Sequence, residues 1–165
     1  NGATGSKVEH VIKLFDRAWF DLQCWHKGIP KKTTLQEAYE KMHAVNGIGS
    51  FMAAQVVADL KYVHPLEKAS DWMDFVAPGP GSQRGLNRIY EQDLGIKWNN
   101  KKFREALKTL RLSASKMHKP IATLHLQDLQ NCLCEFDKYE RVLHSQGKPR
   151  SQYRPSQEPL PGVDQ

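Results

Sequence analysis

The stretch MHAVNGIGSFMAAQ, residues 42–55, consists of two helix-forming runs joined by Asn46-Gly47-Ile48-Gly49. Glycine adopts backbone conformations that other residues avoid, so the two glycines predict a tight turn. The helix after the turn would begin with uncapped backbone N–H groups, and its dipole favours an anion at the same point. Ile48 is expected to point into the core and hold the two helices together.

This pattern resembles the helix-hairpin-helix of DNA-binding proteins. The resemblance implies that Gly47, Ile48, Gly49 and Ser50 present backbone amides to a DNA phosphate. A glycine-containing connector between two packed helices is the alternative, because a glycine–apolar–glycine turn is a short pattern. DNA is the expected partner, and salt should weaken its binding.

Apolar residues recur at helical spacing along most of the chain. A first amphipathic helix is expected from Val8 to Trp25, and Thr34 and Glu37 form a capping box that starts a second one. The helix over residues 51–60 is apolar nearly all round and is therefore expected to be buried. No stretch shows the period of two that a strand requires, so the predicted class is all-α. Further helices are expected over residues 86–94, 103–110 and 126–143.

The 165 residues correspond to about one domain, which we expect over residues 7–145. Residues 1–6 are expected to be a disordered N-terminus or a cloning remnant, and residues 146–165 a disordered tail. Lys and Arg (24) exceed Asp and Glu (18) by six, which suits a polyanionic partner without identifying one. The cysteine pattern and the lack of a signal or membrane segment indicate an intracellular protein, nuclear in a eukaryote. No metal-ligand spacing or cofactor motif is found, so no metal or cofactor is expected.

Asp74 follows the hairpin along the chain, as an active-site aspartate does in the helix-hairpin-helix DNA glycosylases. A carboxylate in that place can stabilise positive charge on a deoxyribose or accept a proton from a nucleophile. The alternative roles for Asp74 are a helix N-cap and a solvated loop acid. Phe51 stands where bifunctional glycosylases carry a nucleophilic lysine, so Schiff-base lyase chemistry is not expected.

Two longer stretches, DFVAPGPGSQRG at residues 74–85 and LQDLQNCLCEFDKYER at residues 126–141, give a more specific resemblance. They resemble the alpha-glutamyl/putrescinyl thymine pyrophosphorylase family, whose helical domain also occurs beside 5-hydroxymethyluracil DNA kinases. With the hairpin, the resemblance covers residues 34–143. It implies a helical DNA-glycosylase-like fold, with a kinase or another base-modifying enzyme as partner. The implied reaction replaces pyrophosphate on the 5-methylene group of a modified thymine or uracil in DNA with an amine or amino acid.

The second stretch carries a polar stripe, because Asp128, Asn131, Glu135 and Lys138 recur at steps of three and four residues. Surface ion pairing is the alternative explanation of such a stripe. If the stripe faces Asp74, its acids can hold or deprotonate an incoming amine while Lys138 and Arg84 neutralise a phosphate leaving group. The predicted catalytic residues are Asp74, Asp128, Glu135 and Lys138.

The loop at residues 79–85 opens a helix, and its uncapped amides together with Arg84 predict a phosphate cradle. A rigid proline–glycine turn is the alternative. The predicted substrate- and phosphate-binding residues are Gly79, Gly81, Arg84, Asn131 and Tyr139.

Two other functions stay open from the sequence alone. A non-enzymatic DNA-binding or scaffolding module would fit the modest basic charge and the lack of an evident nucleophile. A monofunctional DNA glycosylase would leave abasic sites that alkali cleaves.

Overall fold

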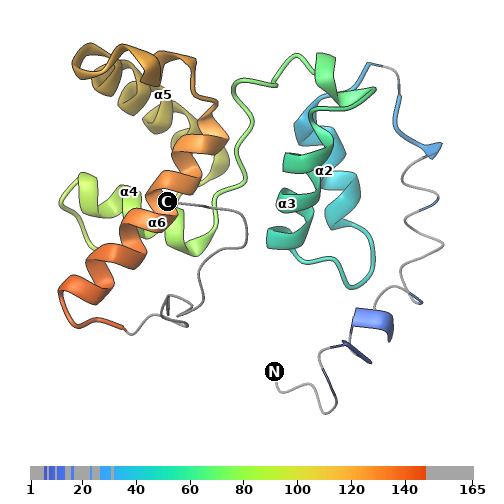
Figure 1. Ribbon diagram of the computed structural model, residues 1–165, viewed down its shortest axis with the longest axis horizontal. Coiled ribbons are helices and arrows are strands. Elements are labelled where there is room, and N and C mark those ends of the chain that lie inside the picture. The colour runs from blue at the N-terminus through green and yellow to red at the C-terminus, as the bar shows by residue number, and fades with distance from the viewer. Residues whose placement is uncertain are drawn as a thin grey trace, which may run out of the picture.

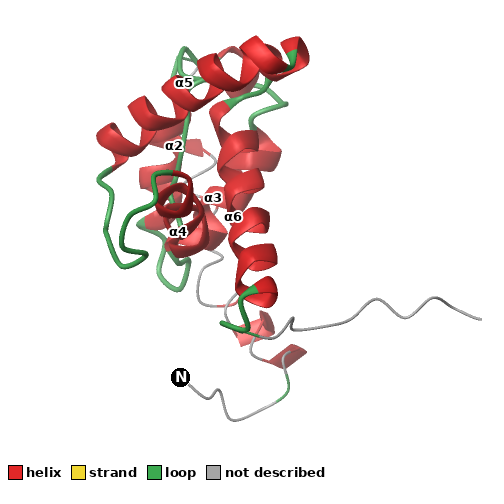
Figure 2. Ribbon diagram, turned by 90° about the vertical axis from the view of Figure 1, so that its left-hand side faces the viewer, coloured by secondary structure: helices red, strands yellow, loops and turns green. Residues whose placement is uncertain are grey.

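Every regular element in the described part of the chain is a helix, which confirms the all-α class (Figure 1, Figure 2). The computed structural model describes residues 6, 8–9, 11–13, 16, 23, 27–30 and 32–147. The tail beyond residue 147, and most of the segment 1–6 and of the helix expected from Val8 to Trp25, lie outside these residues. None of the described helices has the length and apolar character needed to cross a membrane. The elements are α2 (Leu35–His43), α3 (Ser50–Leu60), η1 (Leu66–Lys68), α4 (Pro80–Ile89), α5 (Asn100–Met117), η2 (Lys119–Thr123) and α6 (Leu126–Leu143).

The helices form two groups, one of α2 and α3 and one of α4, α5 and α6, joined by residues 61–79 (Figure 1). Each group has its own hydrophobic core, and burial of this apolar surface stabilises the group. The first core contains Leu35, Ala38, Val57, Leu66, Ala69 and Phe75. The second contains Val76, Leu86, Phe103, Leu107, Leu126, Leu129 and Leu133.

The start of α2 confirms the expected capping box. Thr34 Oγ1 accepts the Glu37 N–H at 3.0 Å, and Glu37 Oε2 accepts the Thr34 N–H at 2.9 Å. Asp71, in the connecting segment, accepts the N–H groups of Leu35 at 2.7 Å and Gln36 at 3.0 Å. These bonds satisfy amides that have no partner within the helix. The hydrogen bond from the Thr34 backbone is the main reason why the pKa of the Glu37 carboxyl lies below its ordinary value.

The turn between α2 and α3 depends on one of its two glycines. Gly47 has a φ of 86°, in the left-handed region that favours glycine. Gly49 has a φ of −77° and an extended conformation that any residue can adopt. Ile48 is partly buried, as expected, and packs against the buried side chains of Met42, Val45 and Ala53.

The expectation that α3 is buried all round is wrong. Ala53, Ala54 and Val57 are buried, but Phe51 is 70% exposed and Met52 is 49% exposed. Val57 belongs to the core that contains Leu35 and Phe75, and Ala53 packs with Met42 and Val45, so these buried side chains meet α2 and the connecting segment. An apolar composition therefore did not reveal how many faces of this helix the neighbouring elements cover.

Helices α4 and α6 approach closely because α4 has glycines where they meet. A Cβ atom on Gly85 would overlap the carbonyl oxygen of Leu133, and one on Gly81 would lie 2.7 Å from Cys134 Sγ. The backbone of α6 cannot move away without disturbing its own hydrogen bonds. The first turn of α4 is therefore fixed against the middle of α6.

Candidate functional site

A cavity of about 100 Å³ lies where the start of α3, residues 77–80 and the middle of α6 meet. It brings together Ser50, Gly79 and Asn131, for which the sequence predicted DNA, phosphate and substrate contacts. This volume is smaller than that of an enclosed cavity that holds benzene, about 150 Å³, so the space suits a phosphate group or part of a small ring. The other lining residues are Tyr39, Phe51, Ala54, Gln55, Ala77, Pro78, Pro80, Ser82, Gln130 and Cys134.

Two helices begin at this cavity without a side-chain cap. Helix α3 starts after Gly49 and α4 after Gly79, and within the described residues no side chain caps either start. The side chains of Thr34, Asn99 and Asp128 accept backbone N–H groups at the starts of α2, α5 and α6. A Cβ atom at Gly49 or Gly79 would have no other atom within 4 Å. The uncapped amides are therefore accessible to an anion.

Side chains from α4 and α6 hold the loop that borders the cavity. Gln130 Oε1 accepts the N–H of Ala77 at 2.9 Å, and Ser82 Oγ donates to the carbonyl of Gly79 at 3.0 Å. A positioned loop keeps the start of α4 in a defined place relative to Asn131.

Two aromatic side chains line the cavity on the side of α2 and α3. Tyr39 is partly buried, stacks on His43 at a centroid distance of 5.7 Å and is tilted against Phe75 at 6.0 Å. Burial, with a smaller effect of Glu40, raises the pKa of the Tyr39 phenol above its ordinary value. Phe51 is largely exposed.

Asp74 is not among the residues that line the cavity. Its Oδ2 atom lies 3.4 Å from Lys108 Nζ, and its Oδ1 atom lies 3.7 Å from Arg111 Nη2. Arg111 also donates to the carbonyl of Leu124 at 3.2 Å, just before α6. In the described part of the chain, the ionic partners of Asp74 thus belong to α5 and not to the polar stripe of α6.

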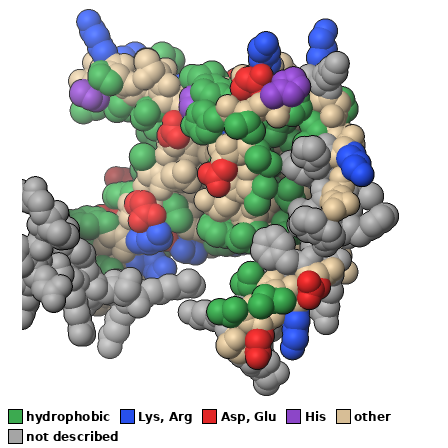
Figure 3. All heavy atoms as spheres, turned by 45° about the vertical axis from the view of Figure 1, so that its right-hand side comes forward, with side chains coloured by type: hydrophobic (Ala, Val, Ile, Leu, Met, Phe, Trp, Pro, Cys, Tyr) green, Lys and Arg blue, Asp and Glu red, His purple; other side chains and the backbone are tan. Residues whose placement is uncertain are grey.

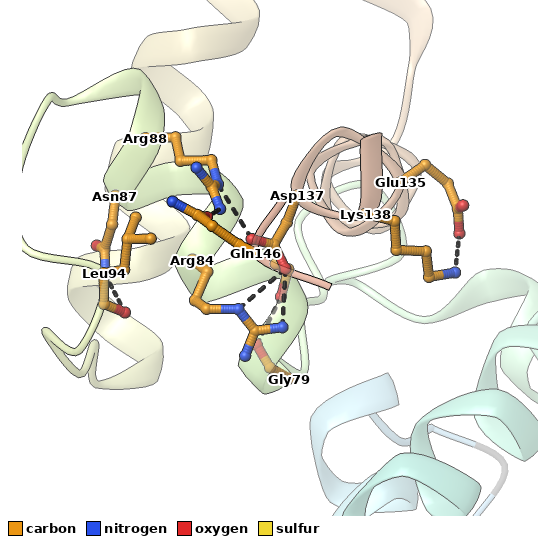
Figure 4. A network of polar contacts seen from close by, with 10 residues as sticks. Gly79, Arg84, Asn87, Arg88, Leu94, Glu135, Asp137, Lys138 and Gln146 are labelled. Atoms are coloured by element: carbon orange, nitrogen blue, oxygen red, sulfur yellow. Dashed lines mark hydrogen bonds and ion pairs between the residues drawn. The ribbon is translucent and has the colours of Figure 1, made fainter. Parts of the chain in front are cut away.

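A buried acid that the sequence did not predict, Asp137, binds Arg84. Arg84 donates from Nε and Nη2 to Asp137 Oδ2 at 2.9 and 2.7 Å, and Arg88 Nε donates to Oδ1 at 3.1 Å (Figure 4). Asp137 is fully buried. Arg84 therefore links α4 to α6 and does not join Lys138 as predicted. The sequence did contain a signal for the burial of Asp137, because Asp137 lies four residues after Leu133 and therefore on the apolar side of the helix.

The polar stripe of α6 faces solvent along most of its length. Glu135 and Lys138 form an exposed ion pair on the side of α6 away from Asp137 (Figure 4). Tyr139 is exposed as well. Lys138 lies one helical turn beyond Cys134, which lines the cavity. The stripe therefore continues from the cavity along α6.

A second polar cluster, unexpected from the sequence, surrounds Lys61 after the end of α3. Lys61 is 2% exposed, and its Nζ lies 2.9 Å from His125 Nδ1 and 3.2 Å from Gln127 Oε1. The Trp72 ring lies 5.3 Å from this Nζ and meets the His125 ring edge-on at 4.1 Å. Burial lowers the pKa of Lys61, and burial together with Lys61 lowers the pKa of His125. Asp128 belongs to this cluster, because its Oδ2 lies 3.4 Å from His125 Nδ1.

On the face shown in Figure 3 the basic side chains do not gather at the centre. Figure 3 shows a face on which Lys and Arg side chains lie toward the edges, while hydrophobic and uncharged groups occupy most of the middle. The net charge of +6 is thus not gathered into one dense patch on this face. An anion bound here would depend mainly on positioned backbone amides.

Over residues 3–149 the chain matches the family model described as 5-hmdU DNA kinase, helical domain. This range contains every helix that the structure describes and every residue predicted for the site. No curated protein and no solved structure shows a significant match to the chain.

Proposed function

The chain belongs to the family of the 5-hmdU DNA kinase helical domain, and we propose that it binds DNA and takes part in modifying a thymine or uracil base. The observation that carries this proposal is the meeting of Ser50, Gly79 and Asn131, from three distant segments, at one cavity. We further propose a helix-hairpin-helix DNA-glycosylase-like arrangement around it. A kinase that phosphorylates the same base is the proposed partner.

DNA phosphates are proposed to bind at the two uncapped helix starts. At α3 the turn residues Gly47, Gly49 and Ser50 supply the amides, whereas the N–H of Ile48, also predicted to contact DNA, already donates to the Val45 carbonyl at 3.0 Å. At α4 Gly79 supplies the accessible backbone. The positive ends of both helix dipoles add to the attraction. Binding of this kind needs only a modest basic charge nearby, which agrees with the dispersed Lys and Arg side chains.

The proposed reaction replaces pyrophosphate on the 5-methylene group of the base with an amine. The amine nitrogen bonds to the methylene carbon, the carbon–oxygen bond to pyrophosphate breaks, and the amine loses one proton. Glu135 lies one turn beyond Asn131 on the same face of α6 and is the proposed proton acceptor. Lys138 and the first-turn amides of α4 are proposed to stabilise the charge of the departing pyrophosphate.

The decisive experiment supplies the substrate directly. The protein is incubated with DNA that contains 5-pyrophosphorylmethyl uracil and with a panel of amines and amino acids, and the DNA is digested to nucleosides for mass spectrometry. We expect a nucleoside in which the amine has replaced pyrophosphate. An unchanged nucleoside profile with every amine, with and without the partner kinase, would rule the reaction out.

A non-enzymatic DNA-binding module is the second candidate, and one observation favours it. Asp74 and Arg84, two groups expected to act on substrate, are instead held in ion pairs with Lys108 and Asp137. Replacing Asp74 with asparagine separates the two functions. A binding module should keep or slightly increase its DNA affinity, whereas an enzyme that uses Asp74 should lose turnover at unchanged affinity.

A further inference from the structure

We propose that the cavity holds the uracil ring of a nucleotide that has left the DNA stack, with Phe51 against the face of the ring and Gln130 donating to a ring carbonyl. This inference rests on the proposed DNA-binding function and specifies what the cavity recognises. It concerns recognition of the base and is independent of which reaction follows.

Phe51 provides the first argument. Its side chain is 70% exposed, although exposure of a large aromatic group to water is unfavourable. It lines the cavity from the first turn of α3, beside the amides proposed to bind phosphate. Aromatic side chains next to bound phosphates typically stack on nucleobases, because every base has a π face. Met52 is also exposed but is not among the residues that line the cavity, so it serves as a matched control.

The size and location of the cavity provide the second argument. A volume of about 100 Å³ is smaller than the cavity of about 150 Å³ that encloses benzene, so the cavity can take part of a six-membered ring while the exposed Phe51 side chain covers the rest. The cavity lies between the starts of α3 and α4, where DNA phosphates are proposed to bind. A base attached to the sugar between them would reach the cavity only after leaving the stack, as substrates of base-modifying enzymes do.

Gln130 provides the third argument. The backbone N–H of Ala77 can only donate a hydrogen bond, so the atom of Gln130 that faces it at 2.9 Å is the oxygen. This bond fixes the orientation of the amide and leaves its NH₂ group as the part that can bind a ligand. An NH₂ donor suits the carbonyl O4 of uracil and opposes the amino group at the same position of cytosine. The cavity should therefore prefer a uracil ring.

The first test measures stacking with single-stranded oligonucleotides that differ only at one central position, which carries either 5-hydroxymethyluracil or an abasic site. Wild-type protein should bind the base-containing strand about 5- to 150-fold more tightly, the range expected for one base stacked on an aromatic side chain. Phe51→Ala should remove most of this preference, and Phe51→Trp should retain it. Met52→Ala should behave as wild type.

The outcomes separate this inference from the proposed function. Equal binding of both strands by the wild-type protein, or an unchanged preference in Phe51→Ala, overturns the base pocket while DNA binding stands. No binding of either strand at low salt overturns both.

The second test changes the hydrogen-bonding group. In Gln130→Glu the carboxylate still accepts the N–H of Ala77, but its other oxygen accepts instead of donating. Wild-type protein should favour 5-hydroxymethyluracil over 5-hydroxymethylcytosine by about 5- to 150-fold, the cost of one unsatisfied buried group. Gln130→Glu should lower or invert this ratio even if its added charge weakens all DNA binding. An unchanged ratio would contradict the assigned role of Gln130.

Discussion

Phe75 and Val76 are neighbours in the chain, yet their side chains are buried in different hydrophobic cores. Phe75 is 2% exposed in the core of α2 and α3, and Val76 is fully buried in the core of α4, α5 and α6. Asp74, just before them, pairs with α5, and the Ala77 N–H, just after them, bonds to α6. This segment therefore fixes the two helical groups relative to each other, and with them the two sides of the cavity.

Replacing Gly79 with aspartate should affect stability and DNA binding in opposite directions. The extended backbone at Gly79 and the free space around it accept an aspartate cap, which should leave stability unchanged or raise it by a few tenths of a kcal/mol. DNA affinity should fall at least about tenfold, because a hydrogen bond to a charged group contributes about 1.5–3 kcal/mol. Urea unfolding and fluorescence anisotropy measure the two effects. Gly79→Ala is the control, because alanine leaves the amides free. Equal DNA affinity of the wild-type protein, Gly79→Asp and Gly79→Ala would show that the start of α4 does not bind DNA.

The two turn glycines should respond differently to substitution by alanine. Gly47→Ala forces a side chain into the left-handed region and should cost about 1 kcal/mol of unfolding free energy. Gly49→Ala meets no neighbouring atom at an ordinary φ and should change stability by less than that. Thermal and urea unfolding of both variants provide the comparison. A larger loss for Gly49→Ala than for Gly47→Ala would contradict the geometry of this turn.

Removing the buried charge of Asp137 should strongly destabilise the protein. Asp137→Asn would leave Arg84 and Arg88 without their shared counter-charge, and breaking a buried ion pair costs about 3–5 kcal/mol. Glu135→Gln, on the exposed side of the same helix, is the control and should lose at most about 1 kcal/mol. Unfolding in urea distinguishes the two variants. Similar, small losses in both would mean that Asp137 does not anchor α4 to α6.

The exposed pair Glu135 and Lys138 should matter for turnover and not for stability. Replacing both with alanine should change the unfolding free energy by at most about 1 kcal/mol, because exposed ion pairs contribute little. Glu135→Gln and Lys138→Met should each reduce turnover about a hundredfold or more if they transfer a proton and stabilise the leaving group. The amine-exchange assay and the melting temperature give both values. Full turnover in both variants would make the pair a surface feature only.

Stability should fall between pH 7 and pH 5 because of His125. Its pKa is lowered in the folded protein by burial and by Lys61, and the opposing Asp128 does not cancel this. Below the ordinary value of 6.5 the unfolded chain binds a proton that the folded protein does not, so acid favours unfolding until the folded pKa is reached. Urea unfolding at a series of pH values measures how steeply the free energy of unfolding falls as the pH is lowered, and His125→Gln should make this fall less steep. His118 is exposed, and His118→Gln is the control that should leave the pH dependence as in the wild-type protein. The same pH dependence in all three proteins would contradict the role of His125.

Features fixed by nearby residues were predictable from the sequence. The capping box of Thr34 and Glu37 and the bounds of α6 at residues 126 and 143 depend on spacings within one helix, and the structure confirms both. The partial burial of Ile48 follows likewise from the short turn around it.

Contacts between distant residues were not predictable in the same way. Arg84 and Asp137 are 53 residues apart, and Lys61 and His125 are 64 residues apart. No periodicity links residues at such separations, so the polar partners of Arg84 and Asp74 were missed. The exposure of Phe51 was missed for a related reason, because it depends on where the neighbouring helices end.

The carboxylate of Asp71 has a consequence for how the chain is made. It accepts N–H groups from Leu35 and Gln36, which are synthesised 36 and 35 residues earlier. While the ribosome is still adding residues 44–70, α2 has only the local cap formed by Thr34 and Glu37. The helix therefore completes its N-terminus after synthesis has passed the hairpin, and a product released before residue 71 would lack this support.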